Sequence, residues 1–274
     1  MSRRSAGSRP PWVLVPPAVL AVLFLALPTV ALLVRAPWSQ LGEIYSHADT
    51  ADGIDVAGAI RLSVVASLVA TAVAVVLGVP LAWLLARLSF PGRGLVRALA
   101  TMPLVMPPVV GGLALLLAFG RRGVVGQWLF DWTGTSLSFT PTAVVIAQTF
   151  VAMPFLVVTL EGAFRSSNRG LEEAAATLGA GRTRVFTHVT FPLVLPSLLS
   201  GMVLCWARAL GEFGATMLFA GNVMGYTQTA PTGVLTAFQS SPGEAVALSL
   251  PMMLIAVVVL LLLRDKWLQG APVS

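Results

Sequence analysis

The sequence predicts an all-α integral membrane protein with about six transmembrane helices. Hydrophobic residues make up 57% of the 274 residues and charged residues only 10%, whereas a soluble domain normally carries about 25% charged residues. Six segments are long and apolar enough to cross a bilayer, which takes about 20 mostly apolar residues. A chain with so few charges cannot cover a water-facing surface, so we expect lipid to cover much of it.

The predicted spans follow one another with modest connections, and five of the six contain no Asp, Glu, Lys or Arg. Arg3, Arg4 and Arg9 precede the first span, as in a signal peptide, but its apolar stretch is too long and no clear cleavage site follows. We therefore expect a membrane domain over 12–263, between tails at 1–11 and 264–274. The spans are expected at 12–34, 62–86, 98–119, 140–160, 193–220 and 245–263.

The distribution of basic residues predicts the orientation of the spans. With the N-terminus inside, the inner segments hold twelve of the 17 Lys and Arg residues, the outer segments hold four, and Arg208 lies within a span. Inner loops of membrane proteins carry the excess of Lys and Arg. We therefore expect a multi-pass protein of the cell membrane with both termini in the cytoplasm, and 161–192 as its longest inner loop.

Several functions are disfavoured by what the chain lacks. The single lysine, Lys266, is not part of the Gly-Lys-Ser/Thr motif that binds nucleotide phosphates, so we expect no ATPase site and no enzyme activity in this chain. The single cysteine, Cys205, excludes an internal disulfide and a cysteine-based zinc cluster. His47 lies in an acidic outer loop that is more typical of solvated residues than of a metal site. The basic residues are scattered between apolar blocks, so we expect neither nucleic acid nor a cofactor bound by the chain.

The inner loop predicts a short helix that ends at a glycine. Residues 172–178 are mostly strong helix formers, and the acids Glu172 and Glu173 stand in the first turn, where the helix dipole favours negative charge. Gly179 provides a stop. A helix this short is unstable alone, so it must pack against its own membrane domain or against a partner.

This loop resembles the signature loop of ABC-importer permeases. The resemblance rests on Glu173-Ala174-Ala175, on Gly179, and on Val189-Thr190-Phe191-Pro192 at the family's spacing. Val189 and Phe191 replace isoleucine and leucine. The resemblance implies the type I importer fold and a coupling helix that inserts into a groove of a separate ATPase subunit, which uses ATP and Mg. Glu172 and Arg182 are interpreted as solvated charges. The coupling residues it implies are Glu172, Glu173, Ala174, Ala175, Gly179 and Pro192.

The third predicted span is unusual because prolines and glycines interrupt it. Three prolines and two glycines stand within residues 102–112, and proline breaks helical hydrogen bonding. Broken backbone is tolerated in a membrane only where protein or a water-filled cavity satisfies it. The segment is either part of a pathway or hinge, or a kinked packing helix. The candidates are Pro107, Pro108, Gly111 and Gly112.

The fifth predicted span contains two ionisable residues. Arg208 and Glu212 are four residues apart and would share one helix face. Ionisable groups in a span usually point inward and pair with one another. The two residues, with Thr216 nearby, either shape a mouth that offers Arg208 to an anion or form a self-neutralised structural pair.

Residues 207–216 closely resemble the corresponding stretch of molybdate permeases, as do Gly221-Asn222, residues 225–229 and the third span. Residues 230–233 depart from the family pattern. The resemblance implies import of molybdate or tungstate by two copies of the chain, two cytoplasmic ATP-binding subunits and an external oxyanion-binding protein. The alternatives are a sulfate or thiosulfate importer, or a stand-alone secondary carrier. The carrier is disfavoured because only one ionisable pair and no inverted repeat are found.

Overall fold

The computed structural model describes residues 12–46 and 55–268, with side chains described to residue 261. The predicted tail 1–11, His47 and most of the predicted tail 264–274 lie outside this part. Every element of regular secondary structure in this part is a helix, which confirms the predicted all-α class. Five helical segments are long and apolar enough to cross a membrane: Trp12–Val34, Val56–Arg87, Pro141–Ser166, Arg182–Leu210 and Pro242–Leu261.

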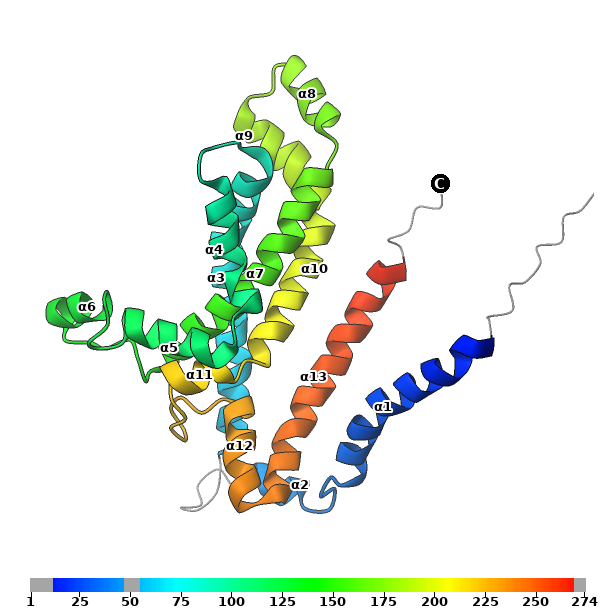
Figure 1. The fold of residues 1–274 in the computed structure, drawn as a ribbon, viewed down its shortest axis with the longest axis vertical. Coiled ribbons are helices and arrows are strands. Elements are labelled where there is room, and N and C mark those ends of the chain that lie inside the picture. The colour runs from blue at the N-terminus through cyan, green and yellow to red at the C-terminus, as the bar shows by residue number, and fades with distance from the viewer. Residues whose placement is uncertain (1–11, 47–54, 269–274) are drawn as a thin grey trace, which may run out of the picture.

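Three of these helices form a bundle along the long axis of the molecule (Figure 1): α3 (Val56–Arg87), α7 (Pro141–Ser166) and α10 (Phe191–Leu210). The bundle packs closely because small residues recur on the facing sides. Ala70, Ala74 and Ala82 of α3 are fully buried in the same cluster as Leu156 and Leu160 of α7. Small residues at such positions let the backbones of membrane helices approach each other.

The segment predicted as one span at 98–119 is instead two helices, α4 (Arg93–Val105) and α5 (Pro108–Phe119). Met106 and Pro107 between them are extended, with ψ of 132° at both residues. Two consecutive prolines remove two N–H donors and force the residue before each one out of the helical region. In Figure 1, α4 lies along the bundle whereas α5 runs across it.

The predicted span 193–220 is interrupted as well. Helix α10 follows a short helix, α9 (Arg182–Val185), and a π-helical segment, Phe186–Thr190, and it ends at Leu210. A turn over 211–213 then leads into α11 (Gly214–Phe219), which packs against α5. Glu212 therefore lies beyond the helix that carries Arg208, and the two residues do not share a continuous helix.

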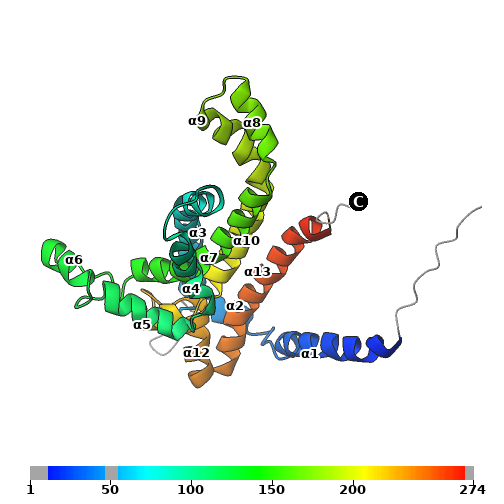
Figure 2. The ribbon, with the colours of Figure 1, turned by 45° about the horizontal axis from the view of Figure 1, so that its top comes forward.

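The remaining helices lie beside this bundle or project away from it. Helix α1 (Val15–Val34) has no buried residue and stands apart from the bundle, and α6 (Gly126–Thr133) projects in another direction (Figure 2). Helices α12 (Ala230–Ser240) and α13 (Pro242–Leu268) pack against each other. Helices α2 (Leu41–Ser46) and α12 lie at the end of the long axis opposite α8 (Arg169–Thr177) and α9.

Candidate coupling site and pathway segments

Helix α8 forms where the sequence predicts a short helix in the longest inner loop. The Asn168 side chain caps it by accepting a hydrogen bond from the Gly170 N–H at 2.9 Å. At the other end, the Leu178 N–H donates to the carbonyl of Ala174. Gly179 then adopts a φ of 87°, a left-handed conformation that favours glycine. The helix therefore ends at the predicted glycine for a conformational reason.

One side of α8 and the turn that follows it faces away from the chain. Leu178 is 89% exposed and Leu171 48% exposed, and Glu173 and Ala174 are exposed beside them. Ala175 is half-buried, and Pro192 is exposed in the first turn of α10. A leucine side chain that protrudes outside the apolar spans would be stabilised by burial against another apolar surface. This surface, which we call the α8 face (Leu171, Glu173, Ala174 and Leu178), is suited to contact with another protein.

Glu172 behaves differently from its neighbour because it is tied to the membrane bundle. Arg87, the last residue of α3, donates from Nη2 to Glu172 Oε1 at 2.5 Å and to Ser167 Oγ at 2.6 Å. The side chain of Arg87 is only 8% exposed and that of Glu172 is 22% exposed. The interpretation of Glu172 as a solvated charge is therefore wrong. A buried guanidinium at a helix end needs a counter-charge, and the loop provides it.

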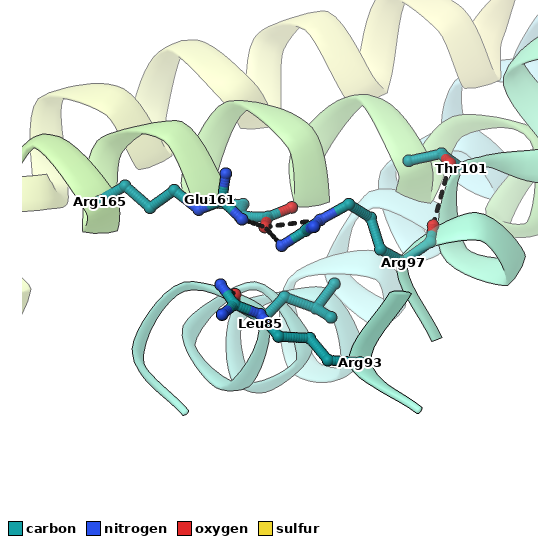
Figure 3. A network of polar contacts seen from close by, with 6 residues as sticks. All are labelled: Leu85, Arg93, Arg97, Thr101, Glu161 and Arg165. Carbon is teal, nitrogen blue, oxygen red and sulfur yellow. Dashed lines mark hydrogen bonds and ion pairs between the residues drawn. The ribbon is translucent and has the colours of Figure 1, made fainter. Parts of the chain in front are cut away.

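A second ion-pair network links α4 to α7 at the same end of the molecule (Figure 3). Glu161 accepts from Arg97 Nε at 3.0 Å and Nη2 at 2.6 Å, and from Arg165 Nη2 at 2.6 Å. The Glu161 side chain is 8% exposed. Arg93, at the start of α4, donates from Nη2 to the carbonyl of Leu85 in α3 at 2.5 Å. Together these contacts join the ends of α3, α4 and α7.

The glycines of α5 are packing residues within this chain. A Cβ placed on Gly112 would lie 2.8 Å from the Cα and carbonyl oxygen of Ala215 in α11, and one placed on Gly111 would lie 3.2 Å from the ring of Phe150. Gly112 therefore permits the close approach of α5 and α11. Pro107 and Pro108 are exposed. Thr216 is buried in α11, and its hydroxyl has no hydrogen-bond partner among the described residues.

Arg208 and Glu212 form the predicted ion pair, with 2.6 Å between Arg208 Nη1 and Glu212 Oε2. The other carboxylate oxygen of Glu212 accepts a hydrogen bond from the Ala215 N–H at 2.9 Å. Glu212 is 1% exposed, whereas the side chain of Arg208 is 28% exposed. The carboxylate therefore holds both the end of α10 and the start of α11, and Arg208 is the partner that retains access to the surroundings.

Sequence reasoning missed Arg87, Arg97 and Glu161 as site residues. The basic residues were used only to orient the spans. Arg87 is 85 residues from Glu172 in sequence, and Arg97 is 64 residues from Glu161. Neither pair can therefore be predicted from a local spacing in the sequence. The available signal was the position of Glu161 directly after the apolar span predicted at 140–160, where an acid must find a cation. The described residues contain no group of His, Cys, Asp or Glu suited to a metal.

Comparison with known proteins identifies the family. Residues 74–265 match the model of the family described as binding-protein-dependent transport system inner membrane component. The chain belongs to this family. It is 44% identical over 252 residues to the molybdenum transport system permease protein ModB of Mycobacterium tuberculosis, covering 92% of each chain. It is 42% identical to the protein of the same name from Escherichia coli, covering 77% of this chain and 92% of that one.

The arrangement of the helices also resembles that of chains in solved structures of ABC transporters. A chain in the crystal structure of a bacterial ABC transporter that imports the acidic polysaccharide alginate superposes with a TM-score of 0.63, covering 95% of both chains at 17% identity. The identity is low, so this likeness concerns the fold. It extends over nearly the whole chain.

Proposed function

We propose that this chain is the transmembrane subunit of an ATP-driven oxyanion importer and forms the pathway for molybdate or tungstate. The carrying observation is the 44% identity over 92% of the chain to a molybdenum transport permease. Two of the segments that resemble molybdate permeases coincide with interruptions of the helices. The broken third span forms the α4–α5 turn, and Arg208 and Glu212 sit where α10 gives way to α11.

The α8 face is the proposed docking site for the ATPase. Its exposed leucines lie beside the exposed carboxylate of Glu173, which suits a groove with apolar walls and a polar anchor. In this proposal, two cytoplasmic subunits bind ATP and Mg and hydrolyse the nucleotide. The chain itself catalyses no reaction and carries no cofactor, and it receives motion through α8.

The proposed orientation puts α8 and both termini in the cytoplasm. Arginines from α3, α4, α7, α8 and α9 gather at the α8 end of the molecule, and an excess of basic residues marks the cytoplasmic side. At the opposite end, α2 and α12 would face the external oxyanion-binding protein that delivers the substrate.

A second copy of the chain would complete the pathway. Arg208 is held in an apolar segment with its side chain 28% exposed, and a guanidinium that faces lipid is costly. A water-filled passage between two copies would accommodate this charge and present it to an anion. The homodimer is therefore part of the proposal.

The test of coupling uses the α8 face. Deletion of 173–179 should abolish transport-linked ATP hydrolysis without preventing membrane insertion. The substitution L178E, which changes a side chain that packs against little in its own chain, should weaken capture of the ATPase subunit. The matched control V124E adds the same charge at a residue that is 76% exposed in the connection before α6. Unchanged uptake after the deletion would refute the coupling proposal.

Two further measurements separate the alternatives. Competition among molybdate, tungstate, sulfate and thiosulfate for uptake by the reconstituted complex distinguishes a molybdate importer from a sulfate or thiosulfate importer. Uptake by the purified chain alone under an ion gradient tests the stand-alone carrier. Transport without any ATPase subunit would favour the carrier over the importer.

A further inference from the structure

A pocket of about 460 Å³ lies between the end of α3 and the α8–α9 segment, and no step of the proposed transport cycle uses it. The cap of the pocket comes from the inner loop, and its floor comes from the membrane bundle. The lining residues that carry the inference are Trp83, Arg87, Arg169, Glu172, Arg182 and Phe186.

Arg87 supplies the first reason to expect an anion in this pocket. Its side chain is more than nine-tenths buried, and the two hydrogen bonds described above use only Nη2. Its Nε and Nη1 are buried and have no hydrogen-bond partner among the described residues. Buried donors without acceptors are rare in native structures because they lose their water and gain nothing in exchange. The pocket beside Arg87 is where an acceptor can be placed.

Two more arginines supply the second reason. Arg169 and Arg182 line the pocket from α8 and α9, and both are exposed and form no ion pair within the described part of the chain. The lining thus includes three arginines and two glutamates, Glu172 and also Glu173 of the α8 face. Glu172 is already committed to Arg87. The unmatched charge at the rim is positive, and arginine suits the oxygens of a phosphate group.

The walls of the pocket indicate which anion it takes. Trp83 and Phe186 meet edge to face with ring centroids 6.2 Å apart, and Leu88 and Val185 extend the apolar wall. A small free anion would make no favourable contact with these apolar walls, whereas a lipid carries a phosphate together with apolar acyl chains that would. Basic pockets between membrane helices on the cytoplasmic side bind lipid headgroups.

We propose that this pocket binds the phosphate headgroup of an anionic phospholipid of the inner leaflet. The inference rests on the inner placement of α8 in the proposed function. The phosphate lies among Arg87, Arg169 and Arg182, and the acyl chains leave past Trp83 and Phe186. A lipid held there bridges the end of α3 to α8 and α9, and so supports the same junction as the Arg87–Glu172 pair.

The test is native mass spectrometry of the purified permease–ATPase complex, titrated with phosphatidylglycerol or with phosphatidylcholine. We expect one tight phosphatidylglycerol adduct for each copy of the permease and no comparable phosphatidylcholine adduct. R182Q should weaken this adduct about fivefold, and R169Q/R182Q by about the square of that factor, at the energy typical of one basic residue near an anionic surface. The matched control R184Q removes the same charge two residues away, outside the pocket, and should retain the adduct.

Three outcomes would overturn the inference. Equal weakening by R182Q and R184Q would mean that only the general charge of the loop matters. Binding of inorganic phosphate in lipid-free detergent, with the same dependence on Arg182, would assign the pocket to a free oxyanion. An adduct on the permease alone that disappears when the ATPase subunits are added would assign it to an acidic side chain of that partner. Failure of the two subunits to associate would count against the proposed function instead, because the titration of the chain alone still reports lipid binding.

Discussion

The Arg87–Glu172 pair allows a quantitative prediction about how firmly α8 is held. An exposed ion pair contributes about 0–1 kcal/mol, whereas removal of one partner of a buried pair costs about 3–5 kcal/mol. Arg87 is nearly buried, Glu172 lies at the rim, and Ser167 still accepts a hydrogen bond from Arg87. We therefore expect E172Q to weaken the docking of α8 by about 2 kcal/mol, which raises the undocked population about 30-fold.

Hydrogen exchange of peptides that cover 169–178 measures this population directly, because amides exchange when a segment opens locally. E172Q should accelerate exchange in α8 and leave the α3–α7 bundle unchanged. E173Q is the matched control, because it removes the adjacent carboxylate, which is exposed and has no ion pair among the described residues. Equal exchange in E172Q and the wild type, or equal acceleration in both variants, would refute the reasoning.

Three other residues give predictions that thermal unfolding can check. G112A should lower stability by about 1–3 kcal/mol through overpacking, whereas G94A, whose Cβ would meet nothing within 4 Å, should not; equal effects would contradict the close approach of α5 and α11. E212A should cost more stability in the wild-type background than in the R208A background, and the difference, which is the coupling energy of the pair, should be about 0.5–3 kcal/mol. Equal costs in the two backgrounds would contradict the ion pair. Burial raises the pKa of Tyr45 above its ordinary value of 10.0. The contribution of Tyr45 to the stability of the folded chain is therefore complete below pH 10 and falls as the pH rises through the raised pKa. The Tyr45 hydroxyl donates a hydrogen bond to the carbonyl of Ala247 in α13 at 2.7 Å, so Y45F should cost about 1 kcal/mol below pH 10 and remove this alkaline decline. An unchanged decline would assign it to another group.

The long helices could be predicted from the sequence because their signal is composition. Four predicted spans, at 12–34, 62–86, 140–160 and 245–263, correspond to helices long and apolar enough to cross a membrane. The interrupted segments could be predicted only in part. The prolines near 107 predicted a break in the helix, but the hydropathy of a segment does not predict the direction in which the chain continues after the break. The directions of α5 and α11 are those in which the two helices pack together, with Gly112 against Ala215, and this contact joins residues far apart in sequence.

The candidate coupling site shows the same division between local and distant determinants. The helix and its end at Gly179 follow from residues close in sequence, namely the asparagine cap, the strong helix formers and a glycine that adopts positive φ. The partner of Glu172 comes from a helix that ends 85 residues earlier, and pairing at that separation is set by the tertiary fold alone. The interpretation of Glu172 as solvated failed because the loop was treated apart from the bundle beneath it.

The ion pairs at the α8 end of the bundle determine what a displacement of α8 can do to the rest of the chain. Arg87 ties α8 to α3, and Glu161 ties α4 to α7. The small residues between α3 and α7 leave these helices little freedom to slide, because close-packed interfaces shift between discrete arrangements and do not deform continuously. The Arg87–Glu172 pair therefore links a displacement of α8 to α3, and the packing of α3 against α7 makes these two helices move together. Helices α5 and α11 are attached to this body because Leu115 of α5 and Ala215 of α11 are buried in one hydrophobic cluster with Ala147 of α7. In the proposed importer, motion that α8 receives from the ATPase would thus reach the interrupted helices through a short series of specific contacts, each of which a single substitution can break.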